Sequence, residues 1–370
     1  MKQTINKSSP STLSRTSLVT ETAQIIRLGI SEGRWSGFLP GERDLGQQFQ
    51  ISRPTVRSAL KTLDKEGLIE IRHGHHTKIV KSNSLKAPEP IRKIAALTSL
   101  PGGDKHSPRL AYFMGEIARY VAAAGLDFVA ISDKRTGSQK PQKTLAALVA
   151  QNPNCCWILF RSNAPTQKWF SDKKIPALLL GTCFSKGILD SIDQNMRATC
   201  RHAAGRLLGL GHQHLGLFLP KGKLAGDITS IEGVQEAIAL HRGSAQLSMI
   251  EHDRTFEGKK RAIQAMLRMK RRPTGMIVCG PNSILTSVPT ILGAGVKIPQ
   301  DLSIICRDSE NYLEFLGIDI TRYKINDQSL AQKLSQLAVD LAAGSKSKPY
   351  ARSVEPNFHL GESIGPAKQE

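Results

Sequence analysis

The chain has 370 residues, of which 40% are hydrophobic and 22% charged, so it can form two or three domains with buried cores and is not a disordered or collagen-like chain. Lysine and arginine number 51 against 31 acidic residues, and the resulting net charge of +20 indicates a polyanionic partner. No apolar run reaches the about 18 residues of a membrane span, and the first residues lack the apolar centre of a secretory signal. Of the six cysteines two are adjacent and four are scattered, and without a CxxC pair they favour reduced thiols in a cytoplasmic protein.

The first part of the chain predicts a small DNA-binding domain. Residues 1–16 are rich in Ser, Thr and Lys and are interpreted as a flexible tail. Residues 17–82 show three helical patterns and a β-hairpin, the arrangement of a winged helix-turn-helix. The expected elements are a helix from Leu18 to near Gly33, a short helix around Leu45 and Phe49, a helix from Ser52 to Gly67, and strands Leu68–Arg72 and Thr77–Lys81.

Small polar and basic residues gather at the start of the third expected helix. Ser52 is a good N-cap and Pro54 fits the first turn. A helix that packs across its predecessor projects its N-terminal side chains into the major groove, so we expect DNA contacts there. Arg43 near the start of the preceding helix and the histidines of the hairpin turn extend this surface. The predicted contacts from the residues are Arg43, Ser52, Arg53, Thr55, Arg57, His73 and His75.

The stretch LPGERDLGQQFQISRPTVRSALKTLDKEGLIEIRHGHHTKIV, residues 39–80, resembles the GntR family of bacterial transcription regulators. It keeps the family's order of LP-x-ER, SR-x-TVR-x-AL, L-x-x-EGLIE and a glycine-containing wing. The resemblance implies that Arg43, Arg53 and Arg57 contact DNA, that Thr55 contacts a phosphate or a base, and that Gly74 is the wing glycine. A metal is the alternative for the histidine-dense turn, but no carboxylate or cysteine ligand lies near it in the sequence, so no metal is expected.

Residues 83–91 form a polar linker, and beyond it strands alternate with helices in a doubly wound α/β pattern. The expected strands are Ile94–Thr98, Phe128–Ser132, Cys156–Phe160, Ala177–Leu180, His214–Leu219, Met276–Cys279 and Ser303–Cys306. The expected helices are Met114–Ala124, Ala198–Leu210, Ile231–Leu240 and Ile284–Gly293.

Four segments between residues 92 and 366 resemble, in order, the sensor domain of LacI/GalR-type regulators, which looks like a sugar-binding periplasmic protein. They are IRKIAALTSL, DQNMRATCRHAAGRLLGLGHQHLGLFL, RRPTGMIVCGPNSILTSVPTILGAGVKIPQDLSIICRDS and EPNFHLGESIG. The expected fold is therefore an α+β winged helix-turn-helix followed by an α/β two-lobed periplasmic-binding-protein-like domain over residues 92–366. Arabinose-responsive repressors have this architecture.

The resemblance places an effector pocket at Asp193, Arg307 and Asp308, where the sequence departs from the family at two other positions. Ser230 stands where the family has a pocket arginine, and Pro281 stands where it has an aspartate. Sugar recognition needs polar groups that bond adjacent hydroxyls in pairs. We therefore expect weak or no binding of common monosaccharides, and either an unusual effector or none.

These features favour a transcriptional repressor that binds a pseudo-palindromic operator in double-stranded DNA as a homodimer and is modulated by a small-molecule effector. It would act in the cytoplasm, associated with the nucleoid when bound, without a cofactor and without contact with a membrane. The alternative is an effector-blind DNA-binding protein whose α/β domain only dimerises. An enzyme is disfavoured, because the sequence has no Schiff-base lysine motif, G-x-S-x-G, H-E-x-x-H or Walker A.

Two further runs of the sequence carry alternatives. The run Gly209–His214 begins like a dinucleotide-binding loop, but GxGxxG is not completed and the run follows a helix instead of a strand. Nucleotide binding is therefore not expected there. The run Lys259–Arg272 holds seven basic residues and no acid. It is interpreted as a solvated helix face, with an auxiliary DNA or partner contact as the alternative.

Overall fold

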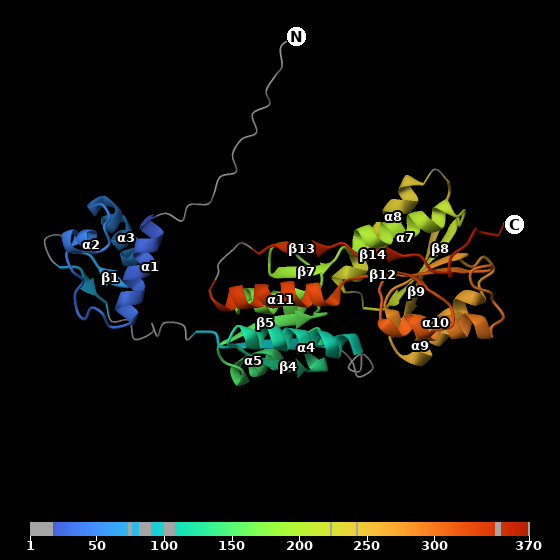
Figure 1. The fold of residues 1–370 in the computed structure, drawn as a ribbon, viewed down its shortest axis with the longest axis horizontal. Coiled ribbons are helices and arrows are strands. Elements are labelled where there is room, and N and C mark those ends of the chain that lie inside the picture. The colour runs from blue at the N-terminus through green and yellow to red at the C-terminus, as the bar shows by residue number, and fades with distance from the viewer. Residues whose placement is uncertain are drawn as a thin grey trace, which may run out of the picture. The chain divides into compact units, whose positions relative to one another are not determined.

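The computed structural model describes residues 18–72, 76–80, 90–99, 108–222, 224–241, 243–344 and 349–368. The chain divides into two compact units, Met1–Glu89 and Pro90–Glu370, which are described separately (Figure 1). The expected tail, residues 1–16, and most of the expected linker, residues 83–91, lie outside the described residues. Within the described ranges, none of the helices is long and apolar enough to cross a membrane.

The first unit contains three helices and a short antiparallel hairpin. The elements are α1 (Leu18–Ser31), α2 (Glu42–Gln48), α3 (Arg53–Lys65), β1 (Ile69–Glu70) and β2 (Lys78–Ile79). Val56, Ala59, Leu60 and Leu63 recur at helical spacing, so α3 buries one face against the rest of a single core. At Gly46 in α2 a Cβ atom would lie 3.2 Å from the carbonyl oxygen of Ile51, so glycine permits this close approach.

The hairpin strands are shorter than the sequence predicts. Strand β1 ends at Glu70, because the backbone N–H of Ile71 donates to the Asp64 side chain instead of to the partner strand. Strand β2 spans Lys78–Ile79, and Lys78 also forms an isolated bridge with Phe38. The sheet of this unit therefore gains a contact from the segment before α2, which the sequence did not indicate.

The second unit has two lobes, each built on a six-stranded sheet. The N-lobe sheet has the order β13-β7-β6-β5-β3-β4 and all of its pairs are parallel. Its strands are β3 (Lys93–Thr98), β4 (Asp127–Ser132), β5 (Cys155–Phe160), β6 (Ala177–Leu180), β7 (Asp190–Gln194) and β13 (Ala351–Val354). Continuous apolar runs such as that of β5, in which every residue is buried, are typical of strands covered on both faces.

Helices cover both faces of the N-lobe sheet. Helices α4 (Pro108–Ala123) and α11 (Asp327–Ala342) lie side by side and form one core with the sheet (Figure 1). Helices α5 (Gln142–Gln151) and α6 (Ala164–Asp172) cover the opposite face. The short 3-10 helix η2 (Lys134–Gly137) follows β4. The alternating pattern thus folds as a three-layer α/β sandwich.

The C-lobe sheet has the order β14-β12-β11-β10-β8-β9, parallel except for β14. Its strands are β8 (His214–Pro220), β9 (Gln246–His252), β10 (Gly275–Val278), β11 (Ser303–Cys306), β12 (Thr321–Lys324) and β14 (Asn357–His359). Helices α7 (Met196–Gly209) and α8 (Ala225–Leu240) cover one face, and α9 (Phe256–Leu267) and α10 (Pro281–Gly293) cover the other. The 3-10 helix η3 (Asn311–Phe315) follows β11.

The chain passes between the lobes three times. It crosses from β7 to α7 at Asn195, from β12 to α11 at residues 325–326, and from β13 to β14 at residues 355–356. The first and third crossings are bonded to each other, because the Asn195 amide side chain donates to Glu355 at 2.6 Å and the Asn195 backbone N–H donates to Val354 at 3.1 Å. The N-lobe is therefore made of chain segments that are far apart in sequence.

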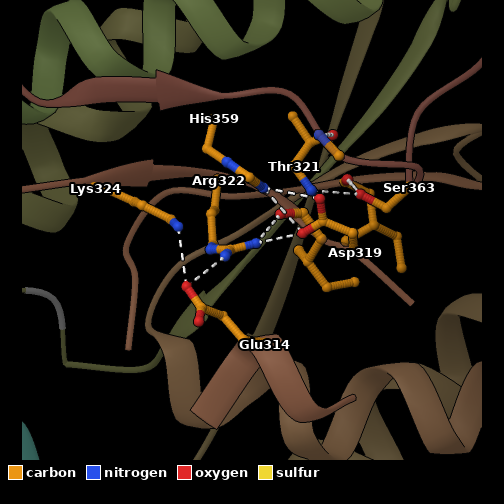
Figure 2. A network of polar contacts seen from close by, with 10 residues as sticks. Glu314, Asp319, Thr321, Arg322, Lys324, His359 and Ser363 are labelled. Atoms are coloured by element: carbon orange, nitrogen blue, oxygen red, sulfur yellow. Dashed lines mark hydrogen bonds and ion pairs between the residues drawn. The ribbon is translucent and has the colours of Figure 1, made fainter. Parts of the chain in front are cut away.

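A buried arginine ties the C-lobe side of two crossings together (Figure 2). The Arg322 side chain on β12 is 1% exposed and donates through Nη1 to Asp319 at 2.7 Å and through Nη2 to Glu314 at 3.4 Å. His359 on β14 contacts the same Asp319 at 2.9 Å, and Lys324 contacts Glu314 at 3.0 Å. This network links η3, β12 and β14, so these elements form one rigid support next to the crossings.

Candidate DNA-binding surface and candidate effector cleft

The start of α3 presents polar side chains to solvent. Ser52 caps the helix, since its Oγ accepts a hydrogen bond from the Thr55 backbone N–H at 3.4 Å, and the two hydroxyl oxygens lie 2.8 Å apart. No acidic residue lies in the first turn. The positive end of the helix dipole and the remaining backbone N–H groups of the first turn attract phosphate, so this helix end suits contact with a nucleic-acid backbone.

Three cations surround this helix end. Arg57 on α3 is 59% exposed and binds Glu42 on α2 through Nε at 3.0 Å and Nη2 at 2.7 Å. Hydrogen bonding to Arg57 lowers the pKa of Glu42, and the charges of Arg57 and Arg53 lower it further. Arg53 is exposed, and exposed Arg43 follows Glu42 directly. The pair with Glu42 therefore fixes Arg57 where α2 meets α3, next to the other two arginines.

The structure brings together five of the eight residues predicted to contact DNA. Arg43, Ser52, Arg53, Thr55 and Arg57 lie at or beside the start of α3. The other three, His73, Gly74 and His75, lie outside the described residues. Sequence reasoning missed Glu42, although an acid beside Arg43 and opposite the first turns of α3 could have indicated it.

A cavity of about 270 Å³ opens between the two lobes of the second unit. Its walls come from the carboxyl ends of parallel strands in both sheets, which is where open α/β sheets bind ligands. Asp193 of the N-lobe and Arg307 and Asp308 of the C-lobe all line it. The structure thus places the three predicted effector residues in one cleft.

Arg307 is held by a buried cluster of polar groups. Its Nη1 donates to Asp227 and to the Ser230 hydroxyl, both at 3.0 Å, and its Nε donates to Asp308 at 3.0 Å. Asp308 also accepts from the backbone N–H of Gly280 at 2.8 Å. Although burial disfavours the charged form, Asp308 and Asp227 raise the pKa of Arg307, so its guanidinium stays protonated.

The Arg307 guanidinium lies next to Ser230, the position where the resemblance expects a pocket arginine. Ser230 lies on α8, and the Arg307 guanidinium reaches it from the end of β11. Pro281 opens α10, and the preceding Gly280 adopts a positive φ of 92° and directs its N–H to Asp308. The guanidinium next to α8 is therefore supplied from a different element, and the number of charged groups in the cleft is larger than expected.

Asp227 is a functional candidate that sequence reasoning missed. It lies in the first turn of α8, where its Oδ2 accepts from the Leu224 backbone N–H at 3.2 Å while Oδ1 binds Arg307. The sequence predicts this helix only over Ile231–Leu240, whereas α8 begins at Ala225, so its first turn lay outside the predicted element. An acid three residues after the N-cap is a recognised N-terminal signal, and it could have indicated this residue.

Asp193 lies on the opposite wall, at the end of β7. Its carboxylate accepts from the Thr182 hydroxyl at 2.6 Å and from the Gln194 backbone N–H at 2.8 Å. Burial raises the pKa of Asp193 to about 6, although these hydrogen bonds and Arg307 oppose the change. A Cβ atom on Gly226 in α8 would lie 3.8 Å from this carboxylate, so the start of α8 approaches the N-lobe here.

The rest of the N-lobe wall combines a fixed guanidinium with aromatic rings. Arg109 on α4 binds Asp327 on α11 through Nε at 2.9 Å and Nη2 at 2.7 Å. Phe113 and Phe160 pack edge to face with ring centroids 6.2 Å apart, and both line the cavity. The hydroxyl of buried Ser162, another lining residue, has no hydrogen-bond partner within the described ranges. This wall offers an apolar surface beside polar donors.

The sequence predicts that the basic run Lys259–Arg272 forms one helix face, and the structure differs from this prediction. Helix α9 ends at Leu267, so Lys259, Lys260 and Arg261 are helical while the other four basic residues follow the helix. Arg261 contacts Asp253 at 3.4 Å.

Among the described residues there is no cluster of three or more His, Cys, Asp or Glu side chains that could hold a metal ion.

The two units define a class of protein: a winged helix-turn-helix domain of the DNA-binding type, followed by a two-lobed α/β domain with a charged cleft. Comparison with known families agrees with both assignments. Residues 18–79 match the model of bacterial regulatory proteins of the gntR family, and residues 191–364 match the periplasmic binding protein-like domain. The chain therefore carries a GntR-type helix-turn-helix domain and a periplasmic-binding-protein-like domain.

Relatives of the chain match it over part of their length. It is 34% identical over 110 residues to the HTH-type transcriptional repressor NanR of Klebsiella aerogenes, covering 29% of this chain and 41% of that protein. It is 24% identical over 148 residues to the ribose operon repressor of Haemophilus influenzae, covering 39% of this chain and 43% of that protein. The chain thus spans about two fifths of the length of these relatives.

Solved structures resemble the second unit in fold. A LacI family transcriptional regulator from Bifidobacterium animalis has a TM-score of 0.64 at 16% identity, covering 75% of this chain and all of that one. A LacI family regulator from Enterococcus faecium, solved with bound ribose, has a TM-score of 0.63 at 18% identity over the same shares. At these identities the comparison shows the shared two-lobed architecture alone.

Proposed function

We propose that this chain is a sequence-specific DNA-binding transcriptional regulator that acts as a repressor in the cytoplasm. The observation that carries the proposal is the start of α3, where Ser52, Thr55 and the exposed arginines 43, 53 and 57 converge on a capped helix end without acids. Small hydroxyls and guanidiniums are the groups that bond phosphates and guanine edges. The match to the gntR family model over residues 18–79 supports this assignment.

A direct test uses selection from a random pool of double-stranded DNA with the full chain. We expect enrichment of a pseudo-palindrome, because a single module makes few base contacts and a homodimer doubles them. Mobility-shift titration of the enriched site then gives the affinity. A pool that shows no enrichment over the unselected library contradicts the proposal.

A second copy of this chain is the partner that the homodimer requires. In the C-lobe, Ile231 and Ile238 of α8 lie with Leu247 and Met249 of edge strand β9 along an open groove. Apolar side chains on an exposed sheet edge favour association. We expect Met249→Lys to shift the chain toward the monomer in sedimentation velocity and to weaken operator binding, whereas Gln246→Lys on the same strand serves as the control.

The cleft supports control by a small-molecule effector. Arg307 Nη2 makes no hydrogen bond among the described residues and is not sealed from solvent, and the same holds for Asp308 Oδ1. Both residues line the cavity, so it contains a charged donor next to a charged acceptor. Such a pair can bond two adjacent groups of one ligand.

Effector binding between the lobes would change their relative orientation and so alter operator affinity. Allosteric coupling of this kind is typically about 1–3 kcal/mol, a change of roughly 5–150-fold. The test is titration of the selected operator in the presence of the dialysable small-molecule fraction of cells. A shift that Asp308→Asn abolishes supports effector control, and an unchanged titration with every fraction supports the effector-blind alternative.

A further inference from the structure

The two ends of the C-lobe strands face different parts of the second unit. The cleft takes the carboxyl ends, so the amino ends of the same parallel strands form the opposite edge of the sheet. Gly275 at the start of β10 pairs with Ser303 at the start of β11 and with Leu215 near the start of β8, so the segments before these strands lie side by side. In Figure 1 the C-terminal segment runs to this end of the C-lobe, away from the N-lobe.

Three segments at this edge carry basic side chains. The segments before β10 and β11 are joined, because the Ser303 backbone N–H donates to the Thr274 carbonyl at 2.9 Å. The C-terminal segment crosses the same edge, because the Ala367 N–H donates at 2.8 Å to the carbonyl of Leu210, which lies ahead of β8. The three segments are residues 268–274, 294–302 and 365–368. We call their basic residues the distal basic surface: Arg268, Lys270, Arg271, Arg272, Lys297 and Lys368.

Acidic residues do not balance the distal basic surface. Besides the six basic residues, the three segments hold one acid, Asp301. Asp301 binds Lys368, whose hydrogen bond lowers the pKa of this carboxyl, and the charge of Arg272 lowers it further. The next acids along the edge are Asp319, which belongs to the network of Figure 2, and exposed Glu362. An excess of positive charge therefore remains at this edge.

Four cations of this surface have no side-chain partner in the described part of the chain. Arg268, Lys270, Arg271 and Lys297 are exposed, and their side chains make no hydrogen bond or ion pair with the described residues. Like charges on adjoining loops repel one another, and a polyanion that covers them removes this repulsion and releases its own counter-ions. The surface is therefore suited to a partner with closely spaced negative charges.

We propose that the distal basic surface binds the phosphate backbone of duplex DNA without sequence preference, as a second DNA contact separate from α3. The inference goes beyond the proposed function, because it assigns DNA binding to the unit that carries the cleft. Guanidinium and ammonium groups are the side chains that neutralise phosphates. Contacts at this edge leave the cleft open at the other ends of the strands, so the C-lobe can bind DNA and an effector at the same time.

The make-up of the three segments favours duplex DNA over other polyanions. They contain no aromatic residue, so they offer no platform on which unpaired bases could stack and no aromatic anchor of the kind that is common at the centre of a protein interface. They are loops, so they present no helix or β-ribbon that could enter the major groove. The contacts that remain join flexible cations to phosphates, which gives affinity without sequence specificity.

The test removes the contribution of α3 and measures the binding that remains. The full chain with Arg43, Arg53 and Arg57 changed to alanine is titrated by fluorescence anisotropy, at about 50 mM salt, against a random-sequence duplex of about 30 base pairs. We expect binding that weakens by at least about tenfold when Arg268, Lys270, Arg271 and Lys297 are also changed to glutamine. The slope of log affinity against log salt should fall by about 3–4, the value for four phosphate contacts.

The matched control removes the same number of charges elsewhere. Lys140, Lys143, Lys173 and Lys186 are exposed on the N-lobe, and replacing them with glutamine changes the net charge by the same amount. We expect this variant to lose less than about threefold in affinity and to keep the salt slope, because distant exposed charges are screened. The comparison separates a binding surface from the general attraction between a basic chain and DNA.

Three results would overturn the proposal. One is an equal loss of affinity in the two glutamine variants. Another is no binding of the duplex by the chain that lacks the three arginines of the α3 surface. The third is tighter binding of poly-L-glutamate than of the duplex, lost with the distal substitutions, which would identify an acidic polypeptide as the partner. Selection of an operator with α3 intact decides the proposed function independently, so the two failures are distinguishable.

Discussion

The two units use arginine in different ways. On the first unit, Arg57 is 59% exposed and its partner Glu42 lies at the surface, so the pair is in contact with water. In the second, the Arg307 side chain is 9% exposed and its carboxylate partners are buried with it. Exposed pairs contribute about 0–1 kcal/mol to stability, whereas breaking a buried pair costs about 3–5 kcal/mol. The first arginine is therefore free to serve a partner, and the second is also part of the fold.

Salt provides the largest contrast between the two units. A dimer that neutralises about 6–10 phosphates should lose roughly 10³–10⁵ in operator affinity between about 50 and 200 mM salt. Effector binding in the cleft should change far less over the same range, because its charges are shielded from mobile ions. Fluorescence anisotropy for DNA and calorimetry for the effector measure both. Equal salt slopes for DNA and effector binding would show that the charges of the cleft are as exposed to mobile ions as those of the DNA-binding surface.

The basic run sharpens the same measurement. Replacing Lys260, Arg268, Lys270 and Arg271 with glutamine should flatten the salt slope only if this surface contacts DNA. A slope identical to that of the unmodified chain would show that the run is a solvated surface that does not contact DNA.

Removal of the buried guanidinium should have the largest effect on stability. Arg307→Met leaves Asp227 and Asp308 buried without their counter-ion and should lower the free energy of unfolding of the second unit by about 3–5 kcal/mol. Arg352→Met is the control, because Arg352 contacts Asp190 in a more exposed pair and should cost under about 1 kcal/mol. Denaturant titration followed by circular dichroism measures both. A similar cost for the two variants would contradict the buried cluster's role.

Removal of the exposed cations should affect DNA binding without affecting the fold. Arg53→Ala or Arg57→Ala should cost roughly 1–3 kcal/mol of operator affinity. The thermal transition of the first unit should remain unchanged, since neither side chain belongs to its core. Arg34→Ala, which removes an exposed pair with Glu32 on the same unit, serves as the control. Full operator affinity in both test variants would show that the start of α3 is not the DNA-binding surface.

The smallest expected effect is a pH dependence from Asp193. Burial raises its pKa to about 6, so ionisation above that pH opposes folding of the second unit, and the penalty disappears as pH falls and the carboxyl is protonated. Asp193→Asn should therefore stabilise the second unit relative to the unmodified chain at pH 7.5 more than at pH 5.0. Differential scanning calorimetry at the two pH values measures the difference. If the stability difference between Asp193→Asn and the unmodified chain is the same at both pH values, burial does not raise the pKa of Asp193.

The first unit was the more predictable of the two from the sequence. Its fold is local: a cap at Ser52, an apolar stripe on α3 and a glycine at residue 67 fix the helix boundaries within a few residues. The continuous apolar strands of the second unit, such as β5 and β11, were also predicted within one residue of their ends. Polar or short strands were missed, including β7 with the sequence DSIDQ, because their burial depends on neighbours far along the chain.

The candidate cleft could be predicted only in part. Arg307 and Asp308 follow the predicted strand Ser303–Cys306, so their position can be read from the pattern. Asp193 lies on the unpredicted strand β7 and was found only through the resemblance to the LacI/GalR-type sensor. The bond between Arg307 and Ser230 joins residues 77 positions apart, and no local pattern specifies it. The three helices α5, α6 and α11 were missed as well, whereas α9 was anticipated only as the helix face of the basic run, without its boundaries.

The discontinuous N-lobe has a consequence for how the protein emerges from the ribosome. Strand β13 and helix α11 complete this lobe, yet they are synthesised after nearly all of the C-lobe, and β14 is made later still. The first unit, Met1–Glu89, is continuous in sequence and forms its own compact set of contacts, so it can fold as soon as it leaves the exit tunnel. A nascent chain therefore has a DNA-binding domain well before it has an effector cleft, and chains arrested before residue 351 should resist protease in the first unit while the N-lobe is still cleaved.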